Sequence, residues 1–175
     1  MKKAIVLCSF LLFAGSSMLF QGCTKEDTHP TSTIVISMRD APAAFDAVNV
    51  EVTDIEVHSD ADGWTSFPVR DSIYDLLLLQ GNTAAFLTNA VLPSTTISQV
   101  RLILGTHNTV TVGGTVYSLL LSSEDETGLK LNIHKELAGG VTYDLLIDFD
   151  AGQSIVDEGN GSYRLKPVLS AVFLH

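Results

Sequence analysis

Carboxylates are the residues of this sequence whose types and spacing are best suited to chemistry. Asp60 and Asp62 come directly before Gly63, a spacing that resembles the first turn of a calcium-binding loop. A complete loop needs further oxygen ligands and a bidentate glutamate at its end, and residues 64–67 supply no such glutamate. We therefore interpret this motif as the turn of a β-hairpin, with a calcium site as the alternative.

A second group of acids forms a cation site only if the fold brings its members together. Asp148 and Asp150 alternate along one predicted strand and share a face, while residues 124–126 form an acidic stretch. With Asp40 or Asp46 beside them, these carboxylates would repel one another unless a cation or a proton compensated their charge. Calcium is the one cofactor that the sequence suggests, against the simpler interpretation of a solvated rim of loops.

The same loop-borne acids, Asp148 and Asp150 among them, could serve a hydrolase as general acid and base. The sequence contains no nucleophile elbow, phosphate-binding loop, HExxH helix or CxxC pair. Its five histidines are scattered, and His134 is expected to face solvent from a strand. We therefore predict a protein that is not an enzyme, and we keep as the alternative a hydrolase whose catalytic residues come from distant loops.

Two features near the first predicted hairpins suggest an interaction with sugars, one as a bound ligand and the other as a covalent modification. Trp64, Phe67 and Tyr74 lie close together in the sequence, and exposed aromatic rings on a β-sandwich can stack on the apolar faces of sugar rings. Packing in the core is the alternative for these rings. Residues 71–73 (Asp-Ser-Ile) resemble the acceptor motif for O-glycosylation in one Gram-negative phylum, which makes Ser72 a candidate glycosylation site. An ordinary turn would explain the same three residues.

The N-terminal residues predict a secreted protein. Lys2 and Lys3 precede an apolar run over residues 4–20, which is the pattern of a secretory signal peptide. An uncleaved membrane anchor is the alternative, but the run is short for a membrane span and contains small and polar residues. We therefore predict that residues 1–22 are a signal peptide.

The residues around Cys23 predict a lipid anchor. Residues 19–23 (LFQGC) resemble a lipobox, in which a small residue precedes the cysteine whose thiol accepts diacylglycerol. Acyl chains such as palmitate then contribute about 0.8 kcal/mol of membrane binding per buried methylene. Residues 24–27 (TKED), within a polar tether over residues 23–32, resemble the export signal that sends lipoproteins of that phylum to the cell surface. We therefore expect an outer-membrane, lipid-anchored and surface-exposed protein, with a periplasm-facing anchor as the alternative.

Composition and charge narrow the range of partners. The 175-residue chain is 46% hydrophobic and 17% charged, as expected of a folding chain. Its formal net charge is −10, and loss of Lys2 and Lys3 with the leader brings it near −12. An acidic surface repels phosphate backbones, so nucleic acid is not an expected partner. The two cysteines, Cys8 and Cys23, lie in the predicted leader or directly after it. The predicted domain over residues 33–175 therefore contains no cysteine that could form a stabilising disulfide.

Apolar and polar residues alternate with a period of two along most of the chain after residue 33. This pattern, clear over residues 34–39 and 141–150, predicts half-buried β-strands. Between Val52 and Ile55 the apolar positions change parity, as a β-bulge near residues 53–54 would produce.

Glycine and proline predict where the strands end. Gly113 with Gly114, and Gly139 with Gly140, each predict a hairpin turn between two strands. Pro167 predicts an edge position or a bulge in a last strand that reaches residue 173.

Two stretches do not alternate. Residues 82–90 are expected to form about two turns of helix, and residues 153–158 a short turn or helix. The sequence contains no internal repeat or linker after residue 33. We therefore predict one all-β domain over residues 33–175, a two-layer antiparallel β-sandwich of the Greek-key, immunoglobulin- or transthyretin-like kind, with one or two short helices.

A series of motifs resembles the domain of unknown function 4382 family. They occur in the family's order and span nearly the whole domain. One departure is at residues 94–96, where the family tends to have a glycine in the turn. The resemblance implies a β-sandwich of the kind carried by bacterial surface lipoproteins, and it implies no activity. The motifs are MRDAP (38–42), FDAVNV (45–50), IEVH (55–58), YDLL (74–77), LP (92–93), QVRLIL (99–104), GLKL (128–131), DFDA (148–151), SIV (154–156) and YRLKPV (163–168).

These observations predict a non-catalytic cell-envelope lipoprotein whose sandwich binds a glycan or a protein. The alternatives are the hydrolase described above and a structural subunit of a surface assembly. Assembly would proceed by strand addition at an exposed edge near Ile34 or Pro167.

Overall fold

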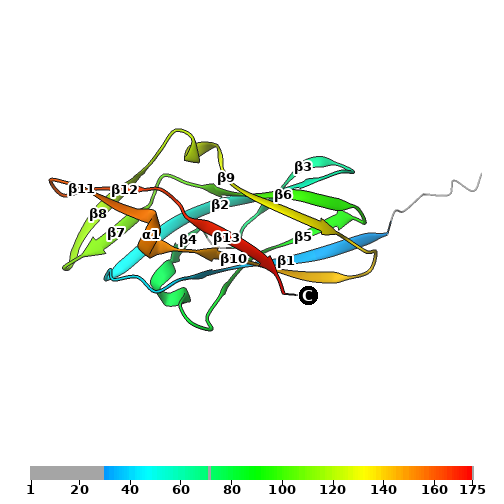
Figure 1. Cartoon of the computed structure of the whole chain (residues 1–175), viewed down its shortest axis with the longest axis horizontal. Coiled ribbons are helices and arrows are strands. Elements are labelled where there is room, and N and C mark those ends of the chain that lie inside the picture. The colour runs from blue at the N-terminus through cyan, green and yellow to red at the C-terminus, as the bar shows by residue number, and fades with distance from the viewer. Residues whose placement is uncertain (1–29, 71, 175) are drawn as a thin grey trace, which may run out of the picture.

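The structure consists mainly of β-strands, whose arrangement Figure 1 shows, and burial alternates along strands such as β1 and β10 as the sequence predicts. It is a computed structural model that describes residues 30–70 and 72–174, so the predicted signal peptide, Cys23 and most of the tether lie outside the described residues. In chain order the strands are β1 (Thr31–Asp40), β2 (Ala47–Ser59), β3 (Gly63–Pro68), β4 (Ile73–Asp75), β5 (Ala85–Pro93), β6 (Thr96–Leu104), β7 (Thr109–Val112), β8 (Thr115–Leu121), β9 (Leu129–Glu136), β10 (Thr142–Phe149), β11 (Ile155–Gly159), β12 (Ser162–Leu165) and β13 (Leu169–Phe173).

The strands form two sheets, and both sheets are mixed. The smaller sheet has the order β13-β10-β1-β5, and the larger has the order β11-β12-β8-β7-β2-β6-β9, with β3 and β4 also paired to β2. The all-β prediction is confirmed, but the prediction of purely antiparallel sheets is wrong, because β1 runs parallel to β10 and β8 runs parallel to β12. Each parallel pair joins strands far apart in the sequence, so no tight turn dictates its direction.

The core lies between the two sheets. β1 and β10 contribute buried side chains from one side, and β2 contributes them from the other. Burial of a large aliphatic or aromatic side chain contributes about 1.5–3 kcal/mol relative to leaving it exposed. The fully buried members with the largest side chains are Phe149, Ile34, Ile36, Met38, Ile55, Leu76, Leu87, Leu92, Ile97, Leu102, Leu145 and Ile147.

The bulge predicted in β2 is confirmed. The pairing of β2 with β6 shifts its register between Val52 and Asp54. Before this point β2 pairs with β4 and β7, and after it β2 pairs with β3 and β6. The bulge therefore lets one long strand serve two groups of neighbours while its apolar side chains stay in the core.

The helix predicted over residues 82–90 is wrong. Residues 85–93 form strand β5, which pairs antiparallel with β1 and buries Leu87, Ala90 and Leu92. The alanines of this stretch favour a helix weakly, and pairing with β1 outweighs that preference. The short turn or helix predicted over residues 153–158 is wrong for most of that range, because the helical turn α1 (Ala151–Ser154) ends at Ser154 and residues 155–159 form β11. The remaining helical segments are the 3-10 turns η1 (Leu76–Leu79) and η2 (Asp125–Thr127).

One predicted turn, at Gly139 and Gly140, and one predicted edge position or bulge, at Pro167, lie where the chain changes sheet. Gly113 and Gly114 form the expected hairpin between β7 and β8. Gly139 and Gly140 do not, because β9 belongs to the larger sheet and β10 to the smaller one. The single last strand predicted around Pro167 is wrong, because at Pro167 the chain passes from β12 in the larger sheet to β13 at the edge of the smaller sheet. Within the described residues, no helix is long and apolar enough to cross a membrane.

Candidate functional site

The predicted calcium motif lies in the hairpin turn between β2 and β3. Ser59 pairs with Gly63 across this turn, and the backbone N–H of Asp62 donates to Ser59 Oγ at 3.0 Å. Asp60 and Asp62 are both exposed. In the part of the chain that the structure describes, no three acidic, histidine or cysteine side chains are grouped so that they could hold a metal ion.

The acids at the end of β10 contact groups of the protein. Arg39 Nη2 lies 2.6 Å from Asp148 Oδ2, and Arg39 Nε donates to the same oxygen at 2.7 Å. The side chain of Asp150 accepts the backbone N–H of Gln153 at 2.9 Å and so caps α1. Asp46 is separate from this group and accepts the backbone N–H of Gly114 at 2.8 Å. These contacts give Asp148, Asp150 and Asp46, which the sequence suggested as cation ligands, a structural role in the fold.

Asp40 is a buried acid beside them, with 3% of its surface exposed. Its Oδ1 accepts the backbone N–H of Ala151 at 2.9 Å, and its Oδ2 accepts Nε2 of Gln80 at 3.2 Å. Burial raises the pKa of the Asp40 carboxyl above its usual value, and the negative charges of Asp150 and Asp148 act in the same direction, while the two hydrogen bonds oppose the change. Asp40 therefore fastens the end of β1 to α1 and to the segment after η1.

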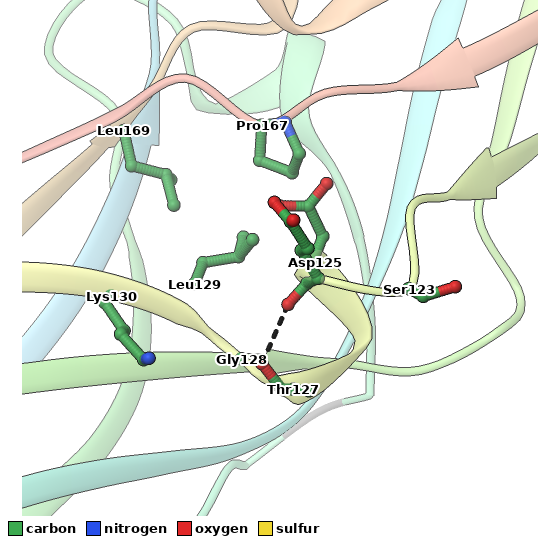
Figure 2. A pocket seen from close by; sticks show the side chains of 9 residues that line it. Ser123, Asp125, Thr127, Gly128, Leu129, Lys130, Pro167 and Leu169 are labelled. Atoms are coloured by element: carbon green, nitrogen blue, oxygen red, sulfur yellow. Dashed lines mark hydrogen bonds between the residues drawn. The ribbon is translucent and has the colours of Figure 1, made fainter.

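The acidic loop over residues 124–126 borders a hollow of about 620 Å³. Figure 2 shows Leu129, Leu169 and Pro167 facing this hollow, while Lys130 points to the other side of β9. The loop is held by its own bonds, since Ser122 Oγ donates to Asp125 Oδ2 at 2.6 Å. The hollow thus has an apolar floor and an acidic rim, and none of its lining residues is a histidine.

A second carboxylate organises the loop between β6 and β7. Glu51 Oε2 accepts the backbone N–H of His107 at 2.9 Å and lies 2.8 Å from its ring Nδ1. The backbone bond from His107 and the bond from its side chain hold the pKa of Glu51 below its usual value. Asn108 completes the arrangement, because its side chain accepts the N–H of Glu51 and donates to the carbonyl of Gly105.

The outer surface of the larger sheet carries a broad array of polar side chains. Strands β3, β2, β6 and β9 lie side by side, and their register aligns outward-facing residues in two rows. We call these rows the polar face. The first row is Trp64, His58, Gln99 and Asn132, and the second row is Ser66, Glu56, Arg101 and Lys130.

Trp64 is the aromatic residue of this face. Of the three aromatic residues singled out in the sequence, Tyr74 is buried and Phe67 packs against the core, whereas 36% of Trp64 is exposed. The Arg101 guanidinium carbon lies 3.7 Å from the centroid of the indole, and the His58 ring packs edge-on against it at 5.1 Å. Both contacts fix the orientation of the indole on the sheet.

Hydrogen bonds order the neighbours of Trp64. Gln99 Nε2 donates to Asn132 Oδ1 at 2.9 Å, and Arg101 Nη1 donates to Glu56 Oε2 at 3.3 Å. His58 Nδ1 lies 2.9 Å from the hydroxyl of Ser98, which fixes its ring. The sequence did not identify these residues as one surface, because only the register between strands aligns them.

Comparison with known families agrees with the motifs. Residues 31–167 match the sequence model of a family described as "Domain of unknown function (DUF4382)". The chain belongs to the DUF4382 family. No curated protein and no solved structure matches this DUF4382 chain. The family match covers nearly all of the β domain.

Two predicted modification sites of the DUF4382 chain remain predictions. Ser72 is exposed just before β4, and its backbone carbonyl accepts the N–H of Val52 at 2.7 Å. Its neighbour Asp71 and the predicted lipidation site Cys23 lie outside the described residues.

Proposed function

We propose that this DUF4382 protein is a non-catalytic binding module, held at the outer face of the outer membrane by a lipid on Cys23. The lipobox-like residues and the export-like TKED segment support the anchor and its location. An extended tether from Cys23 to Pro30 spans at most about 25 Å, so the domain stays close to the membrane surface.

The observation that carries the binding role is the polar face. Buried residues of the same strands, such as Val57, Val100 and Leu131, fill the core, while the outward positions hold an oriented indole among amides and charged groups. A rigid sheet that presents ordered hydrogen-bonding groups loses little conformational entropy when it binds. The contacts of Asp148 and Asp150 with Arg39 and Gln153 support a structural role for the acids over a catalytic one.

Location and binding are tested separately. The anchor predicts that cells fed a labelled fatty acid incorporate the label into the wild-type protein but not into Cys23→Ala, and that protease added to intact cells digests the domain. Label in the Cys23→Ala variant, or a domain that is protected in intact cells and digested only after the outer membrane is opened, would refute this part of the proposal.

The binding role predicts a ligand on an array of glycans and extracellular proteins whose retention is lost in the double variant Trp64→Ala, Asn132→Ala. Val91→Ala, an exposed residue of β5 in the other sheet, is the matched control and should bind as the wild type does. Binding that is unchanged in the double variant contradicts the proposal. So does hydrolysis of ester or glycoside reporters that is abolished in Asp148→Ala.

A further inference from the structure

We infer that the ligand of the polar face is a neutral glycan whose sugar rings stack on the outer face of the Trp64 indole. This inference rests on the proposed function and names the class of ligand for the same surface. It follows from the placement of the indole, the groups around it and the charge of the face.

The Trp64 indole lies over the Arg101 guanidinium. The Arg101 guanidinium carbon is 3.7 Å from the ring centroid, and Arg101 Nε is buried without a hydrogen-bond partner among the described residues. Trp64 nevertheless keeps 36% of its surface exposed. An indole that covers the guanidinium with one face and turns the other face to solvent accounts for both facts. The result is a flat aromatic platform, already oriented before a ligand binds.

The groups beside the platform suit sugar hydroxyls. The Gln99–Asn132 bond uses one donor of Gln99 and one acceptor of Asn132, so the carbonyl oxygen of Gln99 and the amide nitrogen of Asn132 can bond to a ligand. Glu56 and the exposed His134, which follows Asn132 outward along β9, add further acceptors and donors. Sugars need this combination, because a pyranose ring presents C–H groups on its faces and hydroxyls around its rim.

Charge argues against ionic ligands. A guanidinium already occupies one face of the indole, so a cationic ligand on the other face would be repelled by it. On the polar face itself Glu56 offsets Arg101, and only Lys130 remains as a positive charge, whereas the whole chain carries a net charge of −10. An anionic polymer would therefore be repelled by most of the molecule.

The composition of the surface argues against a protein partner. The central part of a protein interface is rich in apolar and aromatic residues and poor in charge. Within the two rows of the polar face the indole is the one large apolar side chain, and its ring contacts are His58 and Arg101. A neutral glycan is the ligand whose chemistry matches both the platform and its surroundings.

Tryptophan fluorescence tests this inference directly, because Trp64 is the only tryptophan of the whole chain. The full-length protein is prepared in a detergent without a sugar headgroup and titrated with soluble neutral polysaccharides: β-glucan, mannan and xylan. Polygalacturonate and heparin serve as anionic probes, and polylysine serves as a cationic probe. We expect saturable changes in emission with at least one neutral polysaccharide and none with the charged probes.

Calorimetry on variants shows where the ligand binds. Trp64→Ala should weaken binding of the responding polysaccharide at least tenfold, which equals about 1.4 kcal/mol. Trp64→Tyr keeps an aromatic ring and should retain a larger part of the affinity than Trp64→Ala. Val91→Ala should bind as the wild type does, and circular dichroism of all variants should show an unchanged sheet signal.

The outcomes separate the inference from the proposed function. The inference of a neutral glycan is refuted if only the anionic or cationic probes give a response, or if the array yields a protein ligand that requires Trp64. The proposed binding role would remain in both cases. If a neutral polysaccharide binds equally well to the wild type and to Trp64→Ala, the Trp64 indole is not the surface on which the sugar stacks. If, in addition, the array yields no ligand that depends on the polar face, the proposed function fails with it.

Discussion

Asp40 offers the sharpest test of how the fold is held together, because Asp40→Ala should lose the two hydrogen bonds of this carboxyl, whereas Asp40→Asn should keep both. Asp40→Ala removes the acceptor for the Ala151 N–H and for the Gln80 amide, two groups that Asp40 satisfies in a buried place. A buried polar group left without its partner costs about 1–3 kcal/mol. We therefore expect Asp40→Ala to lose roughly 2–4 kcal/mol of unfolding free energy.

Asp40→Asn keeps an oxygen for the Ala151 N–H and removes the buried charge. Gln80 can rotate its amide so that its oxygen accepts from the new side-chain NH₂, which keeps both bonds. The pKa of Asp40 is raised in the folded state, so the folded protein holds this proton more tightly than the unfolded chain does. The protonated Asp40 carboxyl therefore contributes its full stabilisation at pH values below 3.8, the usual pKa of the group. This stabilisation is lost as the pH rises through the higher pKa of the folded state.

The stability of Asp40→Asn relative to the wild type should therefore increase from acidic to neutral pH. Urea unfolding, followed by circular dichroism between about pH 4 and 8, gives both free energies, and their difference isolates Asp40 from the other acids. The reasoning is wrong if Asp40→Asn loses as much stability as Asp40→Ala at neutral pH, or if the difference between Asp40→Asn and the wild type does not change with pH.

Three further outcomes are expected. Phe149→Ala empties a fully buried core position and should cost about 3–5 kcal/mol, seen as a lower melting temperature, whereas the exposed Val172→Ala should change it little. The pKa of Glu51 is lowered in the folded protein, so its ionised carboxylate stabilises the fold at pH values above 4.5, the usual pKa. The wild type should therefore lose its extra unfolding free energy over Glu51→Gln as the pH falls through the pKa of the folded state. Urea unfolding measures both free energies, and an equal dependence on pH in the two proteins would contradict this. Arg101→Met removes the cation under Trp64 and should cost about 0.5–2 kcal/mol and shift the tryptophan emission, whereas an unchanged emission spectrum would mean that Arg101 does not order the ring.

Local patterns in the sequence predicted the local parts of the fold. The alternation around Val52 and Ile55 indicated both the strand and its bulge, since one extra residue in a strand is what changes the parity of its apolar positions. The turn at Gly113 and Gly114 was predicted from equally local information, because a two-residue turn joins strands that are neighbours in sequence.

The errors concern partners that are distant in sequence. The alanine-containing stretch before Pro93 became β5 because β1 pairs with it, and nothing within the stretch indicates that pairing. Gly139 and Gly140 predicted a turn correctly but not that the chain changes sheet there. The same limit applies to the candidate site. Trp64 was one of three aromatic residues suggested either to stack on sugars or to pack in the core, and only the register brings it near Arg101 and Gln99.

The place of β1 in the smaller sheet affects how the protein would carry mechanical load. β1 begins at Thr31, within the last two residues of the predicted tether, and is paired along eight residues with β5 and along eight with β10. A force transmitted from a lipid on Cys23 would therefore pull along the axis of a strand that is bonded on both sides. Rupture would require both ladders to shear at once instead of opening bond by bond, and under force the rate of unfolding, not the equilibrium stability, sets the lifetime of the fold. A ligand held at the polar face would place the resisting force on the other sheet, so the packed core between the sheets would bear the tension.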